Sequence, residues 1–378
     1  MGYEVLINFV ETNNEESILS TEYIKPKEVV FVSEKCNDKQ EKLEQYFKEK
    51  YPSVIFTWIE LKDSDIKNVL TKYRKRNSII DISLTSKYLS IEILHLSMKS
   101  CIDVLYMDVS KREITIFNNE EMLKKQVELV DLDIEDIVNT GYGDIVVEST
   151  DIGKEKIIDK LTFLISSNVE VWNKIKQSLI NTDIISHEQS DPYIVNIHLD
   201  KLQDDEIYVY EKMISLLKEY KQISFKKNGR LLQVRFLNNF IKGFIFKTGS
   251  WFENFTKNIV EDIDFIDDVK SGVLFRWDEN ERKIKNEIDV VAVKDGILIC
   301  ISCKDSCKYD ENALNELNVY SHKIGGEKVV KILAATKDPL KSSVNQRSKA
   351  MDIDIITFDG DKQSFKNKIR ASILKKIK

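Results

Sequence analysis

The sequence predicts an α/β protein of more than one domain, and three observations carry this prediction. From residue 3 to about 118, short β-rich runs alternate with segments of helical spacing, which is typical of a mostly parallel sheet covered by helices. In the last third, two apolar runs flank a Lys-Asp-Gly turn, which indicates a buried hairpin. The chain has 378 residues, more than one ordinary domain needs.

The N-terminal elements follow one another in strand–helix order. The expected strands are 4–10, 28–33, 53–60, 78–83 and 102–109, and the expected helices lie near 37–50, 63–74 and 86–100. Right-handed crossovers between such strands give a Rossmann-like sheet. Ligands of these sheets bind beyond the carboxyl ends of the strands, at the point where the strand order reverses.

Two loops of this sheet are candidate ligand-binding segments. One follows the first strand as VETNNEES (10–17), and the other runs from the fourth strand into a helix as DISLTSKYLS (81–90). Free N–H groups at a helix N-terminus favour a phosphate. The candidate residues are Thr12, Asn13, Ser83, Thr85, Ser86 and Lys87. The alternative interpretation of the second loop, which spacing alone favours, is an N-cap followed by a surface lysine.

We expect three domains along the chain: a ligand-sensing domain over 1–145, a connector over 146–228 and a third domain over 229–378. The third domain begins with an amphipathic helix after Gly249, whose aromatic residues we assign to the core. It continues through the hairpin to a helix near 310–324, and then to the strands and the basic tail at 328–336, 352–358 and 366–378.

The hairpin places an acid and a lysine at one corner. Asp295-Gly296 is a dipeptide that favours a two-residue type I′ turn. Such a turn puts Asp289 opposite Ser302, and Lys304 on the same face of the sheet. An acid and a lysine on neighbouring strands suit metal-assisted phosphodiester hydrolysis, because the carboxylate holds a divalent cation and the lysine neutralises developing charge. Glu253, on the preceding helix, is placed to complete the site; a structural ion pair between Asp289 and Lys304 is the alternative.

These motifs resemble those of a known family. IDVVAVKDGILICISCK (288–304) after GSWFENF (249–255) resembles the PD-(D/E)xK, or restriction-endonuclease-like, nuclease fold. Residues 229–378 resemble the nuclease domain of the CRISPR ancillary nucleases that carry an N-terminal CARF sensor, and DISLTSK resembles the ligand segment of that sensor. The usual acid two residues before the lysine is Ser302 here. Glu253, Glu287 or Glu316 is then left to compensate.

The resemblance implies an activity and a regulation. Members form homodimers whose sensors bind a cyclic oligoadenylate, because a two-fold symmetric ligand fits a two-fold interface. The activator expected here is cyclic tetra-adenylate. Their nuclease domains then cut single-stranded RNA or DNA non-specifically with Mn²⁺ or Mg²⁺, and some nick supercoiled duplexes, in type III CRISPR antiviral defence. The implied catalytic residues are Asp289, Lys304, Glu253 and Ser302, with Asp289 and Glu253 as metal ligands. The alternative is a ligand-sensing, nucleic-acid-binding regulator with a degenerate nuclease fold.

The composition of the chain restricts its possible partners, compartment and catalytic residues. The net charge of −6 does not indicate a nucleic-acid coat, and the basic runs at 72–76, 226–230 and 366–378 are solvated faces or local phosphate contacts. Five cysteines, an odd number, favour a reducing compartment, and no apolar run is long enough for a membrane span, so we expect a cytoplasmic protein. Cys300 and Cys303 point to opposite faces of a strand, which disfavours a zinc site. In HEPN ribonucleases, which other members of the sensor family carry, a histidine follows an arginine by about five to seven positions. None of the four histidines has an arginine at that spacing, which disfavours this mechanism.

Overall fold

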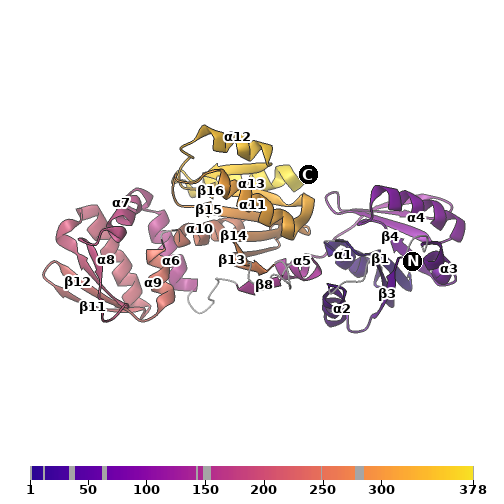
Figure 1. Cartoon of the computed structure of the whole chain (residues 1–378), viewed down its shortest axis with the longest axis horizontal. Coiled ribbons are helices and arrows are strands. Elements are labelled where there is room, and N and C mark those ends of the chain that lie inside the picture. Colours follow the sequence, from indigo (N-terminus) through magenta and orange to yellow (C-terminus); the bar gives the residue numbers. More distant parts are fainter. Residues whose placement is uncertain are drawn as a thin grey trace.

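Three packed parts lie in a row in the protein (Figure 1). The computed structural model describes residues 2–11, 13–33, 39–61, 66–141, 144–147, 155–247, 249–276 and 285–377. The N-terminal sheet is at one end, the sheet of the C-terminal part is in the centre, and a smaller sheet from the middle of the chain is at the other end (Figure 1).

The N-terminal sheet has seven strands in the order β3-β2-β1-β4-β5-β6-β7. Its parallel strands are β1 (Val5–Phe9), β2 (Glu28–Ser33), β3 (Ile55–Glu60), β4 (Ser78–Asp81) and β5 (Asp103–Asp108). The antiparallel strands β6 (Glu113–Phe117) and β7 (Met122–Gln126) extend one edge. The helices are α1 (Glu15–Ile24), α2 (Lys39–Lys50), α3 (Ile66–Tyr73) and α4 (Lys87–Ser100). The five expected strands and three expected helices are confirmed.

Helix α1 was not expected from the sequence. Its residues 16–21 are all buried, so the helix has no one-sided apolar stripe that periodicity could reveal. The strand order reverses between β1 and β4, which are parallel neighbours. The loop before α1 and the loop before α4 therefore meet at this switch point, as the sequence predicts.

The middle of the chain folds into its own antiparallel sheet with helices. The elements are α6 (Glu155–Ser166), α7 (Val169–Ile180), β9 (Ile185–His187), β10 (Ile194–His198), η1 (Leu199–Lys201), α8 (Asp204–Glu219), β11 (Ile223–Asn228), β12 (Leu231–Phe236) and α9 (Asn239–Phe246). The strand order is β11-β12-β10-β9, so the expected boundary at 228/229 falls within the β11–β12 hairpin. Residues 155–228 come between the other two parts along the chain, but in space they lie at one end of the row (Figure 1).

The C-terminal part is built around a six-stranded sheet of order β17-β16-β15-β14-β13-β8. Its strands are β8 (Asp144–Val147), β13 (Asp268–Arg276), β14 (Lys285–Lys294), β15 (Ile297–Lys304), β16 (Val330–Ala335) and β17 (Ile353–Thr357). Its helices are α5 (Ile134–Thr140), α10 (Ser250–Glu261), α11 (Glu311–Gly325), η2 (Gly326–Lys328), α12 (Ser342–Ala350) and α13 (Lys362–Ile377). Strand β8 pairs with β13, so the expected boundary at 145/146 falls inside a strand of this sheet.

Apolar cores join the three parts. One face of the C-terminal sheet packs on α10 and shares its core with the middle part, and Trp251 and Phe252 are fully buried there, as predicted. The other face packs on α11 and shares a core with β1, β2 and α1 of the N-terminal sheet. An ion pair of 2.5 Å between Arg112 and Asp295 adds a polar contact to that second junction. The hairpin of β14 and β15 is therefore anchored on both neighbours.

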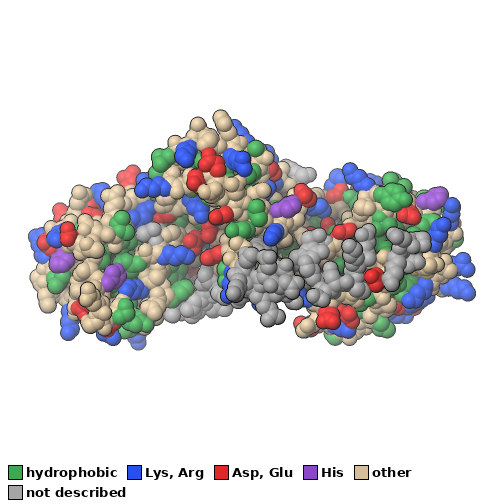
Figure 2. All heavy atoms as spheres, in the orientation of Figure 1, with side chains coloured by type: hydrophobic (Ala, Val, Ile, Leu, Met, Phe, Trp, Pro, Cys, Tyr) green, Lys and Arg blue, Asp and Glu red, His purple; other side chains and the backbone are tan. Residues whose placement is uncertain are grey.

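Charged side chains are mixed on the surface. Figure 2 shows lysines and arginines interspersed with acidic side chains over all three parts of this face, rather than a single continuous basic surface. This agrees with the slightly negative net charge of the sequence. No helix within the described ranges is both long and apolar enough to cross a membrane.

Candidate functional site

The hairpin of β14 and β15 has the register that the sequence predicts. Lys294 pairs with Ile297, and the antiparallel pairing continues to Val290 opposite Ile301. Asp295 and Gly296 both have positive φ, 50° and 72°, as a type I′ turn requires. The expected hairpin is confirmed.

Asp289 is the next residue of β14 beyond the Val290–Ile301 pair, on the side away from the turn. Its Oδ2 accepts hydrogen bonds from the backbone N–H of Cys303, at 2.6 Å, and from Ser302 Oγ, at 3.2 Å. A carboxylate therefore takes the position of a strand partner at the point where the two strands separate. Lys304 continues β15 beside Ala335 of β16 and is half-buried. The structure thus brings Asp289, Ser302 and Lys304 together at one edge.

Glu253 reaches this edge from the first turn of α10. Its Oε1 lies 3.5 Å from the position that a Cβ on Gly249 would occupy, so the turn folds back over the preceding glycine. Burial raises the pKa of Glu253 to about 7, and the negative charges of Asp289 and Glu287 add to this effect. The positive charges of Lys247 and Lys304 act in the opposite direction. Crowded carboxylates with a lysine beside them form one electrostatic cluster.

Asp305 is a residue of this edge that the sequence analysis missed. Its side chain is 3% exposed. It accepts hydrogen bonds from Trp251 Nε1 at 2.7 Å, Lys176 Nζ at 2.8 Å and Thr336 Oγ1 at 3.0 Å. It therefore ties the helix of Glu253 and the strand of Lys304 to α7 and β16. The signal in the sequence was an acid directly after a long apolar strand.

The predicted ligand loops meet at the switch point of the N-terminal sheet, where their hydroxyl groups are used locally. Ser86 caps α4 by accepting from Leu89 N at 3.3 Å. Ser83 Oγ donates to Asp81 and accepts from Met107 N at 2.8 Å, and Thr85 Oγ1 lies 2.6 Å from Ser90 Oγ. Lys87 is exposed in the first turn of α4. Thr12 lies outside the described residues.

A second missed residue is Asn8, near the end of β1. It is 1% exposed and lies opposite Asp81 of β4. Its Nδ2 has no hydrogen-bond partner within the described part of the chain. Burial raises the pKa of the neighbouring Asp81 to about 6, although Ser83 donates to it. A buried donor without a partner at a switch point is a signal for a ligand, and the sequence carried it as one polar residue inside the apolar run VLINF.

The segment that contains this edge matches a known protein family. Residues 242–374 match the family model of the Card1-like endonuclease domain. This segment contains Glu253, Asp289, Ser302 and Lys304, and the match confirms the nuclease resemblance of the last third. No curated protein matches the chain in sequence.

Two solved structures share the fold along the whole chain. Protein VC1899 from Vibrio cholerae has 16% sequence identity and a TM-score of 0.72, and the alignment covers 99% of this chain and 98% of that one. Can2 from Sulfobacillus thermosulfidooxidans, solved in complex with cyclic tetra-adenylate, has 13% identity and a TM-score of 0.64, with coverage of 99% and 97%. At these identities the likeness establishes the architecture, including the arrangement of a parallel N-terminal sheet ahead of the Card1-like endonuclease domain.

The Card1-like domain offers two carboxylates rather than three for a metal ion. Within the described residues, no group of three His, Cys, Asp or Glu side chains is close enough to hold one. Glu287 is exposed but close enough to act on Glu253, whereas Glu316 is exposed on α11 and is not among the charges that act on it. Of the compensating acids, Glu253 is therefore the one best placed beside Asp289.

Two of the three cysteines of the domain, Cys300 and Cys303, are core residues, whereas Cys307 is partly buried. Cys300 packs in the core shared with the N-terminal sheet, and Cys303 packs in the core on the other face, so the two point to opposite faces as expected. Burial raises the pKa of Cys300 to about 12 and that of Cys303 well above the ordinary thiol range. Buried neutral thiols of this kind are unreactive. Cys36 lies outside the described residues.

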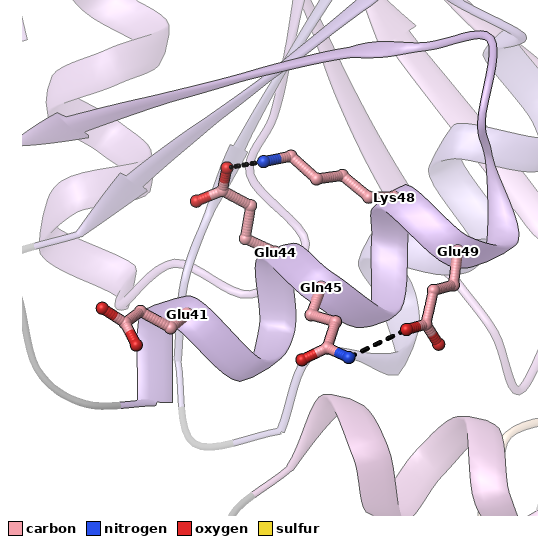
Figure 3. Close-up of a pocket in the computed structure, with 5 residues that line it drawn as sticks. All are labelled: Glu41, Glu44, Gln45, Lys48 and Glu49. Atoms are coloured by element: carbon pink, nitrogen blue, oxygen red, sulfur yellow. Dashed lines mark hydrogen bonds and ion pairs between the residues drawn. The ribbon is translucent and has the colours of Figure 1, made fainter.

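A shallow pocket on the N-terminal part belongs to neither edge. It lies along α2 and is lined by Glu41, Glu44, Gln45, Lys48 and Glu49 (Figure 3). Lys48 pairs with Glu44 at 2.5 Å, and Gln45 donates to Glu49 at 2.9 Å. These are neighbouring residues of one exposed helix face, so we assign no function to this pocket.

Proposed function

We propose that this chain is a nuclease of type III CRISPR antiviral defence that cyclic tetra-adenylate activates. It cleaves single-stranded RNA or DNA without sequence preference, with Mn²⁺ or Mg²⁺, and nicks supercoiled duplexes. The observation that supports the proposal best is the edge formed by Asp289, Glu253 and Lys304 inside the segment that matches the Card1-like endonuclease domain. We assign the seven-stranded N-terminal sheet and its helices to the sensor, and the six-stranded C-terminal sheet and its helices to the nuclease.

The donor set fits a hard divalent cation. Mg²⁺ is commonly held by one or two carboxylates together with water and substrate phosphate oxygens, and Glu253 and Asp289 supply two such carboxylates. Glu253 and Asp289 would hold such a cation, and its charge would oppose the burial and the repulsion by Asp289 that raise the pKa of Glu253. When bound, it would polarise the scissile phosphate and acidify a water molecule.

The residues of the chain supply the remaining requirements. Lys304 carries a positive charge at the same edge and would neutralise the charge that develops on the phosphate. Ser302 Oγ and the Cys303 N–H hold one oxygen of Asp289, which fixes the direction of the carboxylate and leaves its other oxygen available. Asp305, directly after β15, holds α10 in place by accepting a hydrogen bond from Trp251.

The sensor half of the proposal rests on the switch point of the N-terminal sheet. The amide of Asn8, the loop of Asn13 and the N-terminus of α4 with Lys87 lie at the carboxyl ends of β1 and β4. Donors and a cation at such an edge suit the phosphates of a cyclic oligoadenylate. A two-fold symmetric ligand would bind across a homodimer, in which each contact is repeated.

Cleavage assays test the proposal. Labelled single-stranded RNA, single-stranded DNA and supercoiled plasmid are incubated with Mn²⁺, with and without cyclic tetra-adenylate. We expect cleavage only when metal and activator are both present, and none from Asp289→Asn or Lys304→Ala, although both variants fold and bind the activator. Full cleavage by either variant would remove these residues from the mechanism.

Ser302 supports a second candidate, the regulator with a degenerate nuclease fold. A serine stands where the related motif has an acid, and a hydroxyl is a poor ligand for a divalent cation. If the wild type binds the activator but cuts no substrate, Ser302→Asp separates the candidates. Gain of cleavage by this variant would show that the serine alone disabled the site, whereas continued inactivity with nucleic-acid binding would favour the regulator.

A further inference from the structure

The first turn of α1, at the proposed ligand edge, is in direct contact with the C-terminal part. A Cβ on Gly296, in the turn of the catalytic hairpin, would lie 3.9 Å from Glu15 Cγ. A Cβ on Gly326, after α11, would lie 3.0 Å from Asn13 Nδ2. Lys328 Nζ forms an ion pair of 3.0 Å with Glu16 Oε1. Two segments of the C-terminal part, the turn of the hairpin and the single-turn helix η2, therefore reach the first turn of α1 and the loop before it.

The Lys328–Glu16 pair is unequal in burial. The Glu16 side chain is 6% exposed, whereas the Lys328 side chain is 63% exposed. The ammonium group is accessible to a ligand while it neutralises a buried carboxylate. Burial lowers the pKa of Lys328, but the charge of Glu16 and its hydrogen bond outweigh this effect and the pKa is raised. Lys328 therefore stays protonated at neutral pH.

The charged groups that interact with Lys328 belong to the N-terminal sheet and to α1. It interacts electrostatically with Glu15, Glu16 and Tyr106, and it lowers the pKa of Asp108. Glu16 in turn acts on Asp81, which accepts the hydrogen bond of Ser83. The ion pair with Glu16 and the approach of Gly326 to Asn13 place η2, which ends at Lys328, next to the loop that follows β1.

The first turn of α1 needs this cation if an anion is to bind nearby. Glu15 and Glu16 are adjacent acids in that turn, and Glu15 Oε2 is buried with no partner in the part of the chain that is described. Burial, together with the charge of Glu16, raises the pKa of Glu15 to about 8, so a phosphate near neutral pH is repelled mainly by the carboxylate of Glu16. The Lys328 ammonium group offsets the negative charge of Glu16. The only cation identified from the sequence at this edge was Lys87.

We propose that Lys328, which the C-terminal part supplies, is a ligand-binding residue of the sensor edge and contacts the phosphate of the bound cyclic oligoadenylate. This inference rests on the proposed function. It also deepens it, because Lys328 is the last residue of η2, which directly follows α11, and α11 begins shortly after Lys304 and Asp305. A ligand that binds Lys328 acts on the crossover between β15 and β16, the two strands beside the nuclease edge.

The test measures binding of cyclic tetra-adenylate to the full chain by calorimetry. Lys328→Met should weaken binding by about tenfold or more, because a charged hydrogen bond to phosphate is lost. Lys328→Arg should retain most of the affinity. Glu16→Gln should bind as tightly as the wild type or more tightly, because a competing anion is removed. Lys227→Met is the matched control, since Lys227 pairs with Glu211 on the middle part and should not affect binding.

A double variant separates binding from folding. Lys328→Met alone leaves Glu16 buried without its partner and lowers stability. Glu16→Gln with Lys328→Met removes both charges, so this protein should melt closer to the wild type and still bind more weakly than Glu16→Gln. Equal affinity of these two proteins, or tighter binding by Lys328→Met, would overturn the inference and leave the proposed function intact. A wild type that binds no cyclic tetra-adenylate would overturn both.

Discussion

Replacement of Glu253 by glutamine should stabilise the fold in a pH-dependent way. Burial and the neighbouring charge of Asp289 raise the pKa of Glu253 from 4.5 to about 7. A carboxyl whose pKa is raised on folding favours the folded state when protonated, so its contribution is fully present below pH 4.5 and is lost as the pH rises to about 7. Glutamine stays neutral and avoids this loss.

The magnitude follows from the shift. A change of about 2.5 pKa units corresponds to about 3.4 kcal/mol at about 1.36 kcal/mol per unit. At pH 8 almost all of this penalty acts on the wild type, whereas at pH 5 less than about 1 kcal/mol acts on it. The free energy of unfolding of Glu253→Gln, relative to the wild type, should therefore be about 2.5 kcal/mol higher at pH 8 than at pH 5.

Urea denaturation at both pH values measures the difference. Glu219→Gln, at an exposed position at the end of α8, is the control and should change by less than about 0.5 kcal/mol between them. Mn²⁺ should stabilise the wild type at pH 8 more than it stabilises Glu253→Gln, because the metal binds the folded carboxylate. The same relative stability at pH 5 and pH 8 would show that Glu253 is neither buried nor crowded by Asp289, and would refute the site geometry.

Three further predictions concern the ligand edge, the support of the site and the backbone. Lys87→Ala should raise the concentration of cyclic tetra-adenylate needed for half-maximal cleavage without changing the rate at saturation, and an unchanged binding isotherm would remove Lys87 from the ligand site. Asp305→Ala should lower the free energy of unfolding by about 3–5 kcal/mol, because it leaves Lys176 buried without its carboxylate; a urea-measured loss below about 1 kcal/mol would contradict this. Gly325→Ala should destabilise the chain by about 1–3 kcal/mol, since its Cβ would lie 2.9 Å from a valine side chain. Gly243→Ala, on α9, should stabilise the chain by about 0.5–1 kcal/mol, because an added Cβ there meets no atom within 4 Å. Thermal melts in which Gly243→Ala is less stable than Gly325→Ala would contradict both predictions.

Local pattern was enough to predict the elements whose residues signal their own conformation. The five parallel strands were recognisable because each is a short apolar run bounded by polar residues. The hairpin register was recognisable because Asp295-Gly296 selects one turn, and one turn fixes every later pair. The polar corner of Asp289 and Ser302 followed from that register.

Helix α1 and the middle sheet were harder to predict for physical reasons. A helix buried on all sides has no apolar stripe, and residues 16–21 are such a case. The strands β9 and β11 are short or highly exposed, so their sequences lack the alternation that marks a strand. The pairing of β8 with β13 joins segments more than 100 residues apart, which no local pattern encodes.

The sequence by itself therefore determined the strand–helix alternation of the N-terminal parallel sheet, the turn of the hairpin and the identity of the acid and lysine at its end. Period-two alternation and turn chemistry act over a few residues, so they can be seen in one dimension. Only the tertiary structure decided that Glu253 crowds Asp289, that Asp305 binds α7, α10 and β16 together, and that Lys328 reaches Glu16. These contacts form because packed cores bring distant segments to the same edge, and packing depends on shapes that are defined only once the chain has folded.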